Sequence, residues 1–175
     1  KHLDIRGTIL LAPEGININV SIISHKYEVF LADLKKIFNF SKADIKLHTY
    51  DKHIYRKFKI KIKKEILTTR NQQNTNPLRQ VGKYIKPEEW DNLISEPDTM
   101  LIDMRNNYEV NIGTFKNAIN PNCNNFTALL KWLQEKFVNG KKIENKKIAL
   151  FCTGGIRCEK ATSFLMSLTK NKVYH

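Results

Sequence analysis

The sequence predicts two domains of different classes: a small α+β domain over residues 1–68 and an α/β domain with a parallel sheet over residues 81–175. In the first part, strand-like runs surround one helical segment, whereas in the second part short apolar runs alternate with helical patterns. Residues 69–80 are polar, lack apolar periodicity and contain Pro77, which is typical of a linker. The chain has 175 residues, 41% of them hydrophobic, and this length accommodates two small domains.

The first domain is expected to begin with a β-hairpin. Residues 7–12 and 16–22 are rich in apolar and β-branched side chains and flank a Pro-Glu-Gly turn. A helix is expected from Ser24, a suitable N-cap, to residue 37, because apolar residues follow at helical spacing. Two further strands, at residues 45–49 and 57–67, would complete a small sheet with the helix on one face.

Positive charge is concentrated in the first half of the chain. The net charge is +13, and residues 1–80 carry 16 Lys and Arg against 7 Asp and Glu, whereas residues 81–175 carry 14 against 10. A strand over residues 57–63 would place alternate lysines on one face and apolar residues against the core. The lysines are Lys57, Lys59, Lys61 and Lys63, the apolar residues are Phe58, Ile60 and Ile62, and Arg56, Lys64 and Arg70 extend the stripe.

Two interpretations of this cationic stripe are open. It fits the phosphate backbone of a polyanionic partner, and it also fits a solvated edge strand that its lysines protect from aggregation. The surplus of charge over the whole first half favours the polyanionic partner.

The second domain is expected to alternate helices and buried strands. A helix opens at residues 85–90, with proline in its first turn and acidic residues near its N-terminus. A short strand at residues 100–103 precedes a helix over residues 125–137, whose apolar residues recur at helical spacing. A second strand, residues 148–151, precedes a helix over residues 159–168. This alternation predicts a parallel sheet, in which ligands gather at the carboxyl ends of the strands.

Cys152 directly follows the second of these strands and is the candidate nucleophile. Between a strand and a helix, loop N–H groups and the helix N-terminus stabilise a thiolate and can hold an anion. Asp103 ends the other predicted strand. The alternative is a buried, inert cysteine, but Gly154 and Gly155 at this turn have a backbone entropy cost that a packing role would not need.

The spacing from Cys152 to Arg157 is Cys-x4-Arg, one residue shorter than the Cys-x5-Arg loop of cysteine phosphatases. A shorter loop encloses a smaller group, which disfavours phosphatase chemistry. The loop resembles the active-site loop of the rhodanese family, whose members carry a sulfane sulfur on the cysteine as a persulfide. This resemblance implies that Arg157 orients an anionic substrate or closes the loop. The residues between the two are Thr153, Gly154, Gly155 and Ile156, and Cys158 follows directly.

Three stretches together resemble the bacterial tRNA uridine hydroxylases, a rhodanese-like family. They are Gly7–Asn17 (GTILLAPEGIN), Ile102–Phe115 (IDMRNNYEVNIGTF) and Phe151–Lys160 (FCTGGIRCEK). The resemblance implies a ferredoxin-like first domain, a rhodanese-like second domain and formation of 5-hydroxyuridine at the wobble position of tRNA, with dioxygen as co-substrate and a persulfide role for the loop cysteine. It names no electron donor. Family members extend beyond both ends of this chain, so we expect a fragment with an incomplete ferredoxin-like sheet.

Two other functions come from different classes. One is a rhodanese-type sulfurtransferase that carries a cysteine persulfide and has no nucleic-acid substrate. The other is a non-catalytic adaptor that binds RNA through its basic surface. Thiosulfate cleavage would favour the first, and salt-dependent RNA binding without any chemistry would favour the second.

The remaining polar candidates are given supporting roles. Cys158 either resolves an oxidised or persulfidated Cys152 or packs beneath the loop. Asp103 and Arg105 are expected to form a structural ion pair at the strand end, with a functional pair as the alternative, because an unneutralised carboxylate would oppose thiolate formation. Cys123 lies in a polar loop and is expected at the surface.

No metal site or nucleotide-binding loop is predicted, since the cysteines and histidines lack zinc-site spacing and no glycine-rich phosphate loop occurs. No cofactor is evident. Three cysteines, without a long apolar segment, predict a cytoplasmic protein with free thiols and no membrane association.

Overall fold

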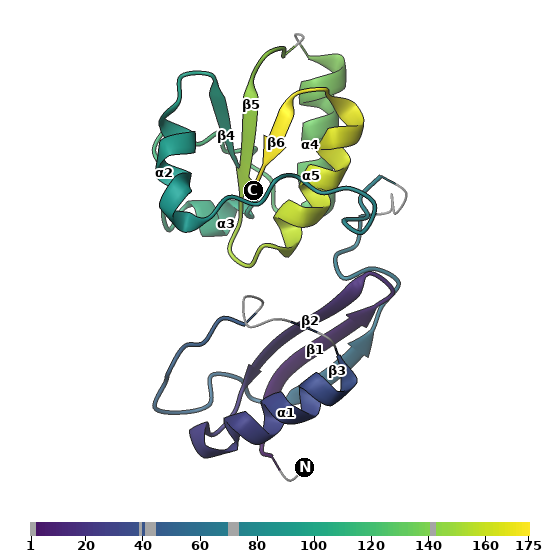
Figure 1. Cartoon of the computed structure of the whole chain (residues 1–175), viewed down its shortest axis with the longest axis vertical. Helices are drawn as coiled ribbons and strands as arrows, with labels where there is room; N and C mark the ends of the chain where they lie inside the picture. Colours follow the sequence, from purple (N-terminus) through teal and green to yellow (C-terminus); the bar gives the residue numbers. More distant parts are fainter. Residues whose placement is uncertain (1–2, 39, 41–44, 70–73, 141–142) are drawn as a thin grey trace. The chain divides into compact units, whose positions relative to one another are not determined.

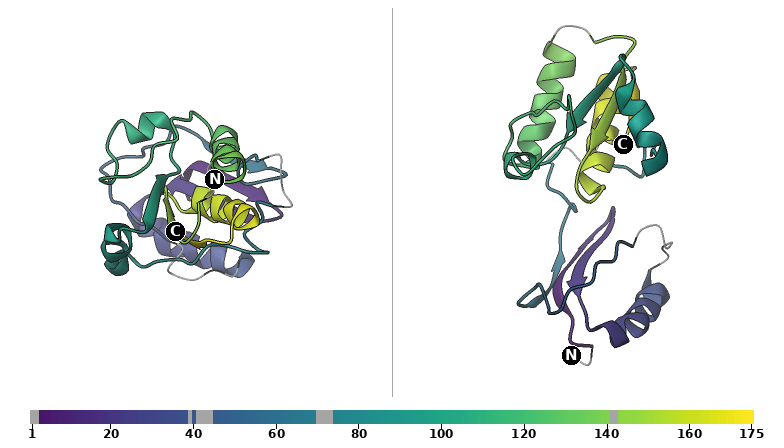
Figure 2. Two further views of the ribbon diagram at one scale, coloured as in Figure 1. Left: turned by 90° about the horizontal axis from the view of Figure 1, so that it is seen from above. Right: turned by 90° about the vertical axis from the view of Figure 1, so that its left-hand side faces the viewer.

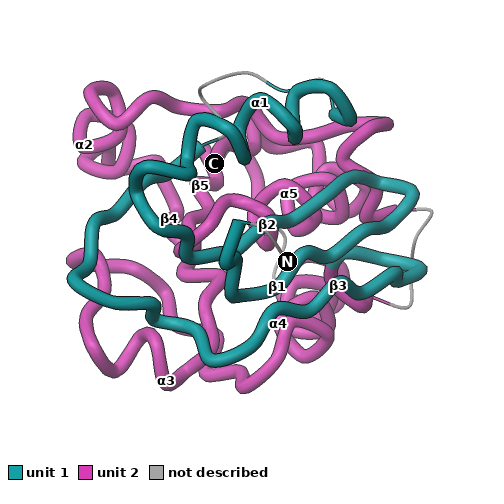
Figure 3. The backbone as a smooth tube through the Cα atoms, turned by 90° about the horizontal axis from the view of Figure 1, so that it is seen from below, with its two compact units in different colours: residues 1–66 teal, residues 67–175 magenta. Residues whose placement is uncertain are grey.

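The structure is a computed structural model that describes residues 3–38, 40, 45–69, 74–140 and 143–175. The chain divides into two compact units, Lys1–Ile66 and Leu67–His175 (Figure 3). Each unit contains a three-stranded sheet, with strand order β2-β1-β3 in the first unit and β4-β5-β6 in the second. The predicted pair of fold classes, α+β followed by α/β, is confirmed.

The expected linker, residues 69–80, makes hydrogen bonds with a helix residue of the second unit in its described part. Gln80 Nε2 donates a hydrogen bond to the Ser163 carbonyl oxygen at 3.0 Å, and the Ser163 hydroxyl donates to the Asn76 carbonyl at 3.1 Å. Residues 70–73 lie outside the described residues, and Arg70 of the cationic stripe is among them. The expected bounds of the domains and the linker stay a prediction.

The first unit is a mixed sheet with one helix across it (Figure 1). Strands β1 (Arg6–Ala12) and β2 (Gly15–Ser21) form the predicted antiparallel hairpin. Strand β3 (Phe58–Ile62) pairs in parallel with β1. A 3₁₀ turn, η1 (Ser24–Lys26), leads into α1 (Tyr27–Ile37).

Three details of this unit were predicted wrongly. Ser24 is not the helix N-cap but begins η1, and the N-cap of α1 is Lys26, which makes no side-chain cap bond. Residues 45–49 form no strand, since they contain only two apolar side chains and Leu47 is exposed. The strand predicted at 57–67 ends at Ile62, close to where its partner β1 ends.

The apolar side of β3 also differs from the prediction. Parallel pairing places Ile60 beside Ile9, and Ile9 is buried, so the predicted alternation is correct. However, Phe58, Ile60 and Ile62 are 43%, 58% and 85% exposed, so no core covers this side. β3 is an edge strand of the sheet. Lysines at 57, 59 and 61 are exposed as expected, whereas Lys63 is partly buried.

Gly7 allows the backbones of β1 and β2 to approach each other closely in the hairpin. Its φ is +127°, and a Cβ built there would lie 2.2 Å from the Asn19 carbonyl oxygen and 2.7 Å from the Val20 Cα. We predict that Gly7→Ala destabilises the first unit by about 2–3 kcal/mol or more, because backbone strain adds to the separation of β1 from β2. Urea unfolding followed by hydrogen exchange of the β1 amides measures the effect.

Gly15→Ala is the matched control. Gly15 has φ +145°, but a Cβ there meets nothing within 4 Å, so only strain applies and the loss of stability should be smaller. Equal losses in the two variants would contradict the argument from close approach at Gly7.

The second unit is a parallel sheet between helices (Figure 2). Its strands are β4 (Thr99–Asp103), β5 (Lys147–Phe151) and β6 (Lys172–Tyr174), and its helices are α2 (Pro87–Ser95), α3 (Asn107–Val110), α4 (Phe126–Gln134), the π-helical turn η3 (Glu135–Asn139) and α5 (Ile156–Leu168). The strands at 100–103 and 148–151 were predicted, as were helices in the regions of α2, α4 and α5, whereas α3 was not. Strand β6 was not, because three residues are too few to show a period.

Two apolar clusters cover the two faces of this sheet. Ile102, Ile148 and Leu150 pack with buried residues of α4 and α5, whereas Leu101 and Ala149 pack with α2. The strands are therefore covered on both faces, as in other parallel sheets flanked by helices. The ends of β4 and β5 lie side by side, since Asp103 pairs with Phe151. Among the described helices, none has the length and apolar character needed to cross a bilayer.

Candidate active site

The candidate site is the loop that joins β5 to α5. Cys152 comes directly after the last residue of β5, and α5 begins at Ile156. Gly155 is the N-cap residue of α5. Its φ is +88°, a backbone conformation that residues other than glycine rarely adopt. This turn allows the Gly155 amide to donate a hydrogen bond to the Cys152 sulfur at 3.1 Å. The loop backbone thus points an N–H group at the thiol, as the sequence predicted.

Several donors converge on the Cys152 sulfur and lower its pKa to about 6. The thiol of Cys158 makes the largest contribution, and the backbone N–H groups of Cys158 and Gly155 add to it. Burial of the sulfur opposes these effects, and the positive charge of Arg157 contributes least. Cys152 is therefore mainly a thiolate at neutral pH, which is the reactive form of cysteine.

Cys158 is the buried partner of this thiolate. It lies in the first part of α5, is 2% exposed and belongs to the apolar cluster beneath the sheet. Burial, and then the neighbouring Cys152 sulfur, raise its pKa well above the usual range. Cys158 thus keeps its proton and donates it in a hydrogen bond. The structure brings Cys152 and Cys158 together without a disulfide between them, and this agrees with Cys158 packing beneath the loop. The role of Cys158 as a resolving thiol stays a prediction.

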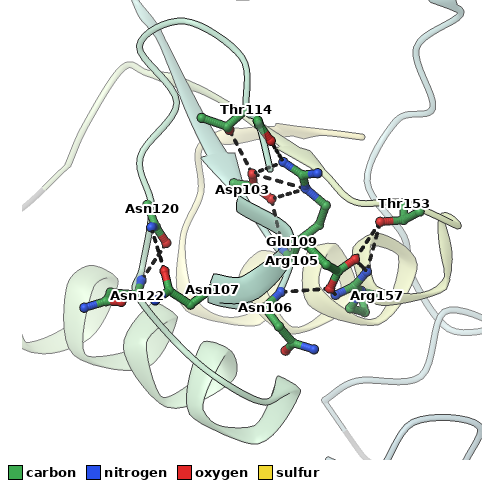
Figure 4. A network of polar contacts seen from close by, with 11 residues as sticks. Asp103, Arg105, Asn106, Asn107, Glu109, Thr114, Asn120, Asn122, Thr153 and Arg157 are labelled. Atoms are coloured by element: carbon green, nitrogen blue, oxygen red, sulfur yellow. Dashed lines mark hydrogen bonds and ion pairs between the residues drawn. The ribbon is translucent and has the colours of Figure 1, made fainter. Parts of the chain in front are cut away.

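Arg157 closes the loop through an ion pair with Glu109 of α3 (Figure 4). Its two terminal nitrogens donate to the two Glu109 carboxylate oxygens at 2.6 and 2.7 Å, and one of them also contacts the Thr153 hydroxyl at 3.3 Å. Thr153 donates to Glu109 as well, at 2.7 Å. Of the two roles expected for Arg157, these contacts support loop closure.

Glu109 was not among the residues that the sequence predicted for this site. The pKa of Glu109 is lowered to about 2, mainly by the hydrogen bonds from Arg157. Hydrogen bonds from the Thr153 hydroxyl and the Asn106 amide lower it further. Its local signal was present in the sequence, because Asn106 and Glu109 form a capping box at the start of α3. A capping box indicates a helix start, but it gives no sign of a partner 48 residues further along the chain.

Asp103 and Arg105 form a structural pair at the end of β4. Asp103 is fully buried, and its carboxylate accepts bonds from the Arg105 side chain at 2.7 and 2.9 Å and from the Thr114 hydroxyl at 2.8 Å. Arg105 also donates to the Gly113 carbonyl at 2.6 Å and lies over the Phe151 ring. The pair therefore ties β4 to the segment after α3 (Figure 4), and its supporting role at the site stays a prediction.

Three further expectations concern Cys123, metal ligands and the RNA-binding lysines. Cys123, expected at the surface, is half-buried against the apolar cluster, its thiol bonds to the Pro121 carbonyl, and burial raises its pKa. Within the described ranges, no three His, Cys, Asp or Glu side chains gather as metal ligands would. The predicted RNA-binding lysines 57, 59, 61 and 63 belong to the first unit, on β3 and its flanks.

Comparison with known proteins matches both units of the chain. Residues 1–66 match the model of the UPF0176 acylphosphatase-like domain, and residues 86–175 match that of the rhodanese-like domain. The tRNA uridine(34) hydroxylase of Rickettsia rickettsii (strain Sheila Smith) is 44% identical over 175 residues, which are 100% of this chain and 69% of the relative. The chain belongs to the tRNA uridine(34) hydroxylase family.

Relatives from other species agree with this assignment. The tRNA uridine(34) hydroxylase of Rickettsia bellii is 41% identical over the whole chain, which covers 69% of that relative. That of Acaryochloris marina is 43% identical over 172 residues, 98% of this chain and 54% of the relative. The family resemblance expected from the three sequence stretches is therefore confirmed.

Proposed function

We propose that this protein is a tRNA-modifying hydroxylase that converts uridine 34, the wobble nucleotide, into 5-hydroxyuridine, with dioxygen as co-substrate. The observation that carries the proposal is a thiolate at the Cys152 loop in a chain that matches tRNA uridine(34) hydroxylases along its whole length. A cytoplasmic location, where thiols stay reduced, is part of this proposal, and the free cysteines and a tRNA substrate support it.

The loop supports nucleophilic chemistry by Cys152. A thiolate held by Gly155 and Cys158 either carries a persulfide or adds to the uracil ring, and ring addition would leave carbon 5 electron-rich and therefore reactive toward an oxidant. The loop amides stabilise the negative charge that the sulfur carries as a thiolate before it reacts. Because the thiol lies at the floor of a loop, the uridine must leave its stack to reach it.

A cellular assay tests the proposed function. Nucleosides from tRNA of cells that lack the protein are compared by mass spectrometry with those of cells complemented with it. Complementation should restore 5-hydroxyuridine and its derivatives. If the nucleosides are the same with and without the protein, and no other enzyme in the strain makes them, the proposal fails.

The second candidate function is persulfide-carrying sulfur transfer. It is favoured by the Cys-x4-Arg spacing and by the lowered pKa of Cys152, which a sulfur carrier also needs. Conversion of thiosulfate and cyanide into thiocyanate, with no effect of the protein on tRNA nucleosides, would place this function first.

We further propose that the lysines along β3 contact the tRNA backbone. Lys59 and Lys61 are exposed on β3, an edge strand of the sheet, and Lys57 is exposed directly before it, so phosphates can reach all three. The triple change to glutamine should weaken tRNA binding at low salt. It should also make the slope of log K against log salt less negative, by about 0.7–0.9 for each phosphate that no longer pairs with a lysine. Fluorescence anisotropy at several salt concentrations measures both quantities.

The matched control removes three exposed lysines elsewhere in the same unit, Lys35, Lys46 and Lys52. It changes the net charge equally, so it should weaken binding less if the stripe on β3 is the contact surface. Equal weakening by the two triple variants would indicate a diffuse charge effect and remove the stripe from the proposed RNA surface.

A further inference from the structure

Two arginines beside the Cys152 loop are already paired with carboxylates of the same unit. Arg157 is paired with Glu109, and Arg105 is paired with Asp103. The side chains of Arg157 and Glu109 are 17% and 16% exposed, so water screens this pair weakly. When the Cys152 sulfur is a thiolate, these five groups together carry one net negative charge.

Glu109 holds Arg157 with both of its oxygens and has no acceptor capacity to spare. The two arginine bonds, the Thr153 hydroxyl and the Asn106 amide account for four hydrogen bonds to this carboxylate, each between 2.6 and 3.1 Å. A two-oxygen bond to a guanidinium fixes the plane as well as the position of the arginine. An incoming anion must therefore compete with a carboxylate that is already in place (Figure 4).

We propose that Glu109 sets the substrate specificity of the Cys152 loop. Because Glu109 holds Arg157, the arginine cannot bind a small anion, and the Cys152 thiolate reacts with an uncharged ring instead. This inference rests on the proposed function, in which the reacting group is an uncharged uracil. A sulfur donor such as thiosulfate carries two negative charges, and it would approach the Cys152 thiolate without a free guanidinium to bind it, since Arg105 and Arg157 are both paired.

Thiosulfate is the probe for the test, with cyanide as the acceptor. The Cys152 thiolate attacks the outer sulfur of thiosulfate, the sulfur–sulfur bond breaks, and sulfite leaves with its electron pair. Cys152 then carries a persulfide. Cyanide takes the outer sulfur as thiocyanate, and the electron pair of the persulfide bond returns to Cys152 as thiolate.

Glu109→Gln is the test variant, since it keeps the size of the side chain and removes its charge. Releasing Arg157 should lower the KM for thiosulfate at least about tenfold, a typical effect of one charged hydrogen bond, while turnover at saturation changes little. Glu159→Gln is the matched control, because Glu159 is an exposed residue of α5, two positions from Arg157, and its change alters the net charge equally. This control should keep the KM of the wild type.

The double variant Glu109→Gln with Arg157→Gln removes the group that would bind the anion. It should lose the improvement that Glu109→Gln produces. A KM for thiosulfate that is the same in the wild type, Glu109→Gln and Glu159→Gln overturns the inference. The tRNA assay is separate, since absence of 5-hydroxyuridine with the wild type overturns the proposed function and leaves the thiosulfate result intact.

A measurement on the wild type avoids any loss of folding in the variants. Cys152 is alkylated with neutral iodoacetamide and with anionic iodoacetate, and the ratio of the two rates is compared with that of a small free thiol. Exclusion of anions predicts a larger preference for iodoacetamide at Cys152 than in the free thiol. A smaller preference would show that the loop attracts anions and would contradict the role of Glu109.

Discussion

Cys152→Ser is expected to abolish formation of 5-hydroxyuridine while tRNA binding stays at the wild-type level. The hydroxyl of serine fits the loop and can accept the Gly155 and Cys158 donations, but it does not ionise near neutral pH as the Cys152 thiol does. Loss of the nucleophile typically reduces turnover on the order of a thousandfold or more. Nucleoside mass spectrometry of complemented cells and anisotropy with purified protein measure the two effects.

Cys123→Ser is the matched control for this change. Cys123 is half-buried, its thiol bonds to the Pro121 carbonyl, and a serine hydroxyl can make the same bond. This variant should therefore keep its activity. Full activity in Cys152→Ser would exclude a thiolate mechanism, and loss of tRNA binding in that variant would show that the cysteine serves the fold or the RNA surface instead.

The surroundings of the Cys152 thiol could be predicted from the sequence because the residues that determine them are local. A buried strand, two glycines and the start of a helix fall within a few residues of Cys152, and the same residues produce the bonds that lower its pKa. The pair of Asp103 and Arg105 was also predicted, because its two partners are two positions apart at a strand end.

Contacts between distant segments could not be predicted in this way. Glu109 meets Arg157 only because α3 follows β4 and the loop follows β5, so that two parallel strand ends lie side by side. Periodicity has a similar limit on β3. It correctly assigned Phe58, Ile60 and Ile62 to one side of the strand, but alternation within a strand does not show whether another layer covers that side.

The second large effect is expected at Cys158. Its thiol donates the bond that contributes most to lowering the Cys152 pKa, and it remains protonated because burial raises its own pKa. Cys158→Ala removes this donor and leaves the backbone N–H groups of the loop. The pKa of Cys152 should then rise from about 6 toward its ordinary value of 9.0, by one or more units.

The pH dependence of alkylation by iodoacetamide, followed on the peptide that contains Cys152, measures this shift. For the wild type, the rate should rise with pH through about 6 and level off above about 7, because the thiolate is the reacting form. The Cys158→Ala curve should lie at higher pH, so that its rate at pH 7 is reduced about twofold for a shift of one unit and about tenfold for a shift of two, while the two proteins react alike above about pH 10.

Cys158→Ser separates hydrogen bonding from packing. The serine hydroxyl restores a donor at almost the same place, so the midpoint of its alkylation curve should lie closer to the wild type than that of Cys158→Ala. If both substitutions shift the midpoint equally, the buried thiol acts through packing of α5 rather than as a donor. An unchanged midpoint in both variants would instead assign the low pKa to the loop amides, of which the Gly155 amide donates at 3.1 Å.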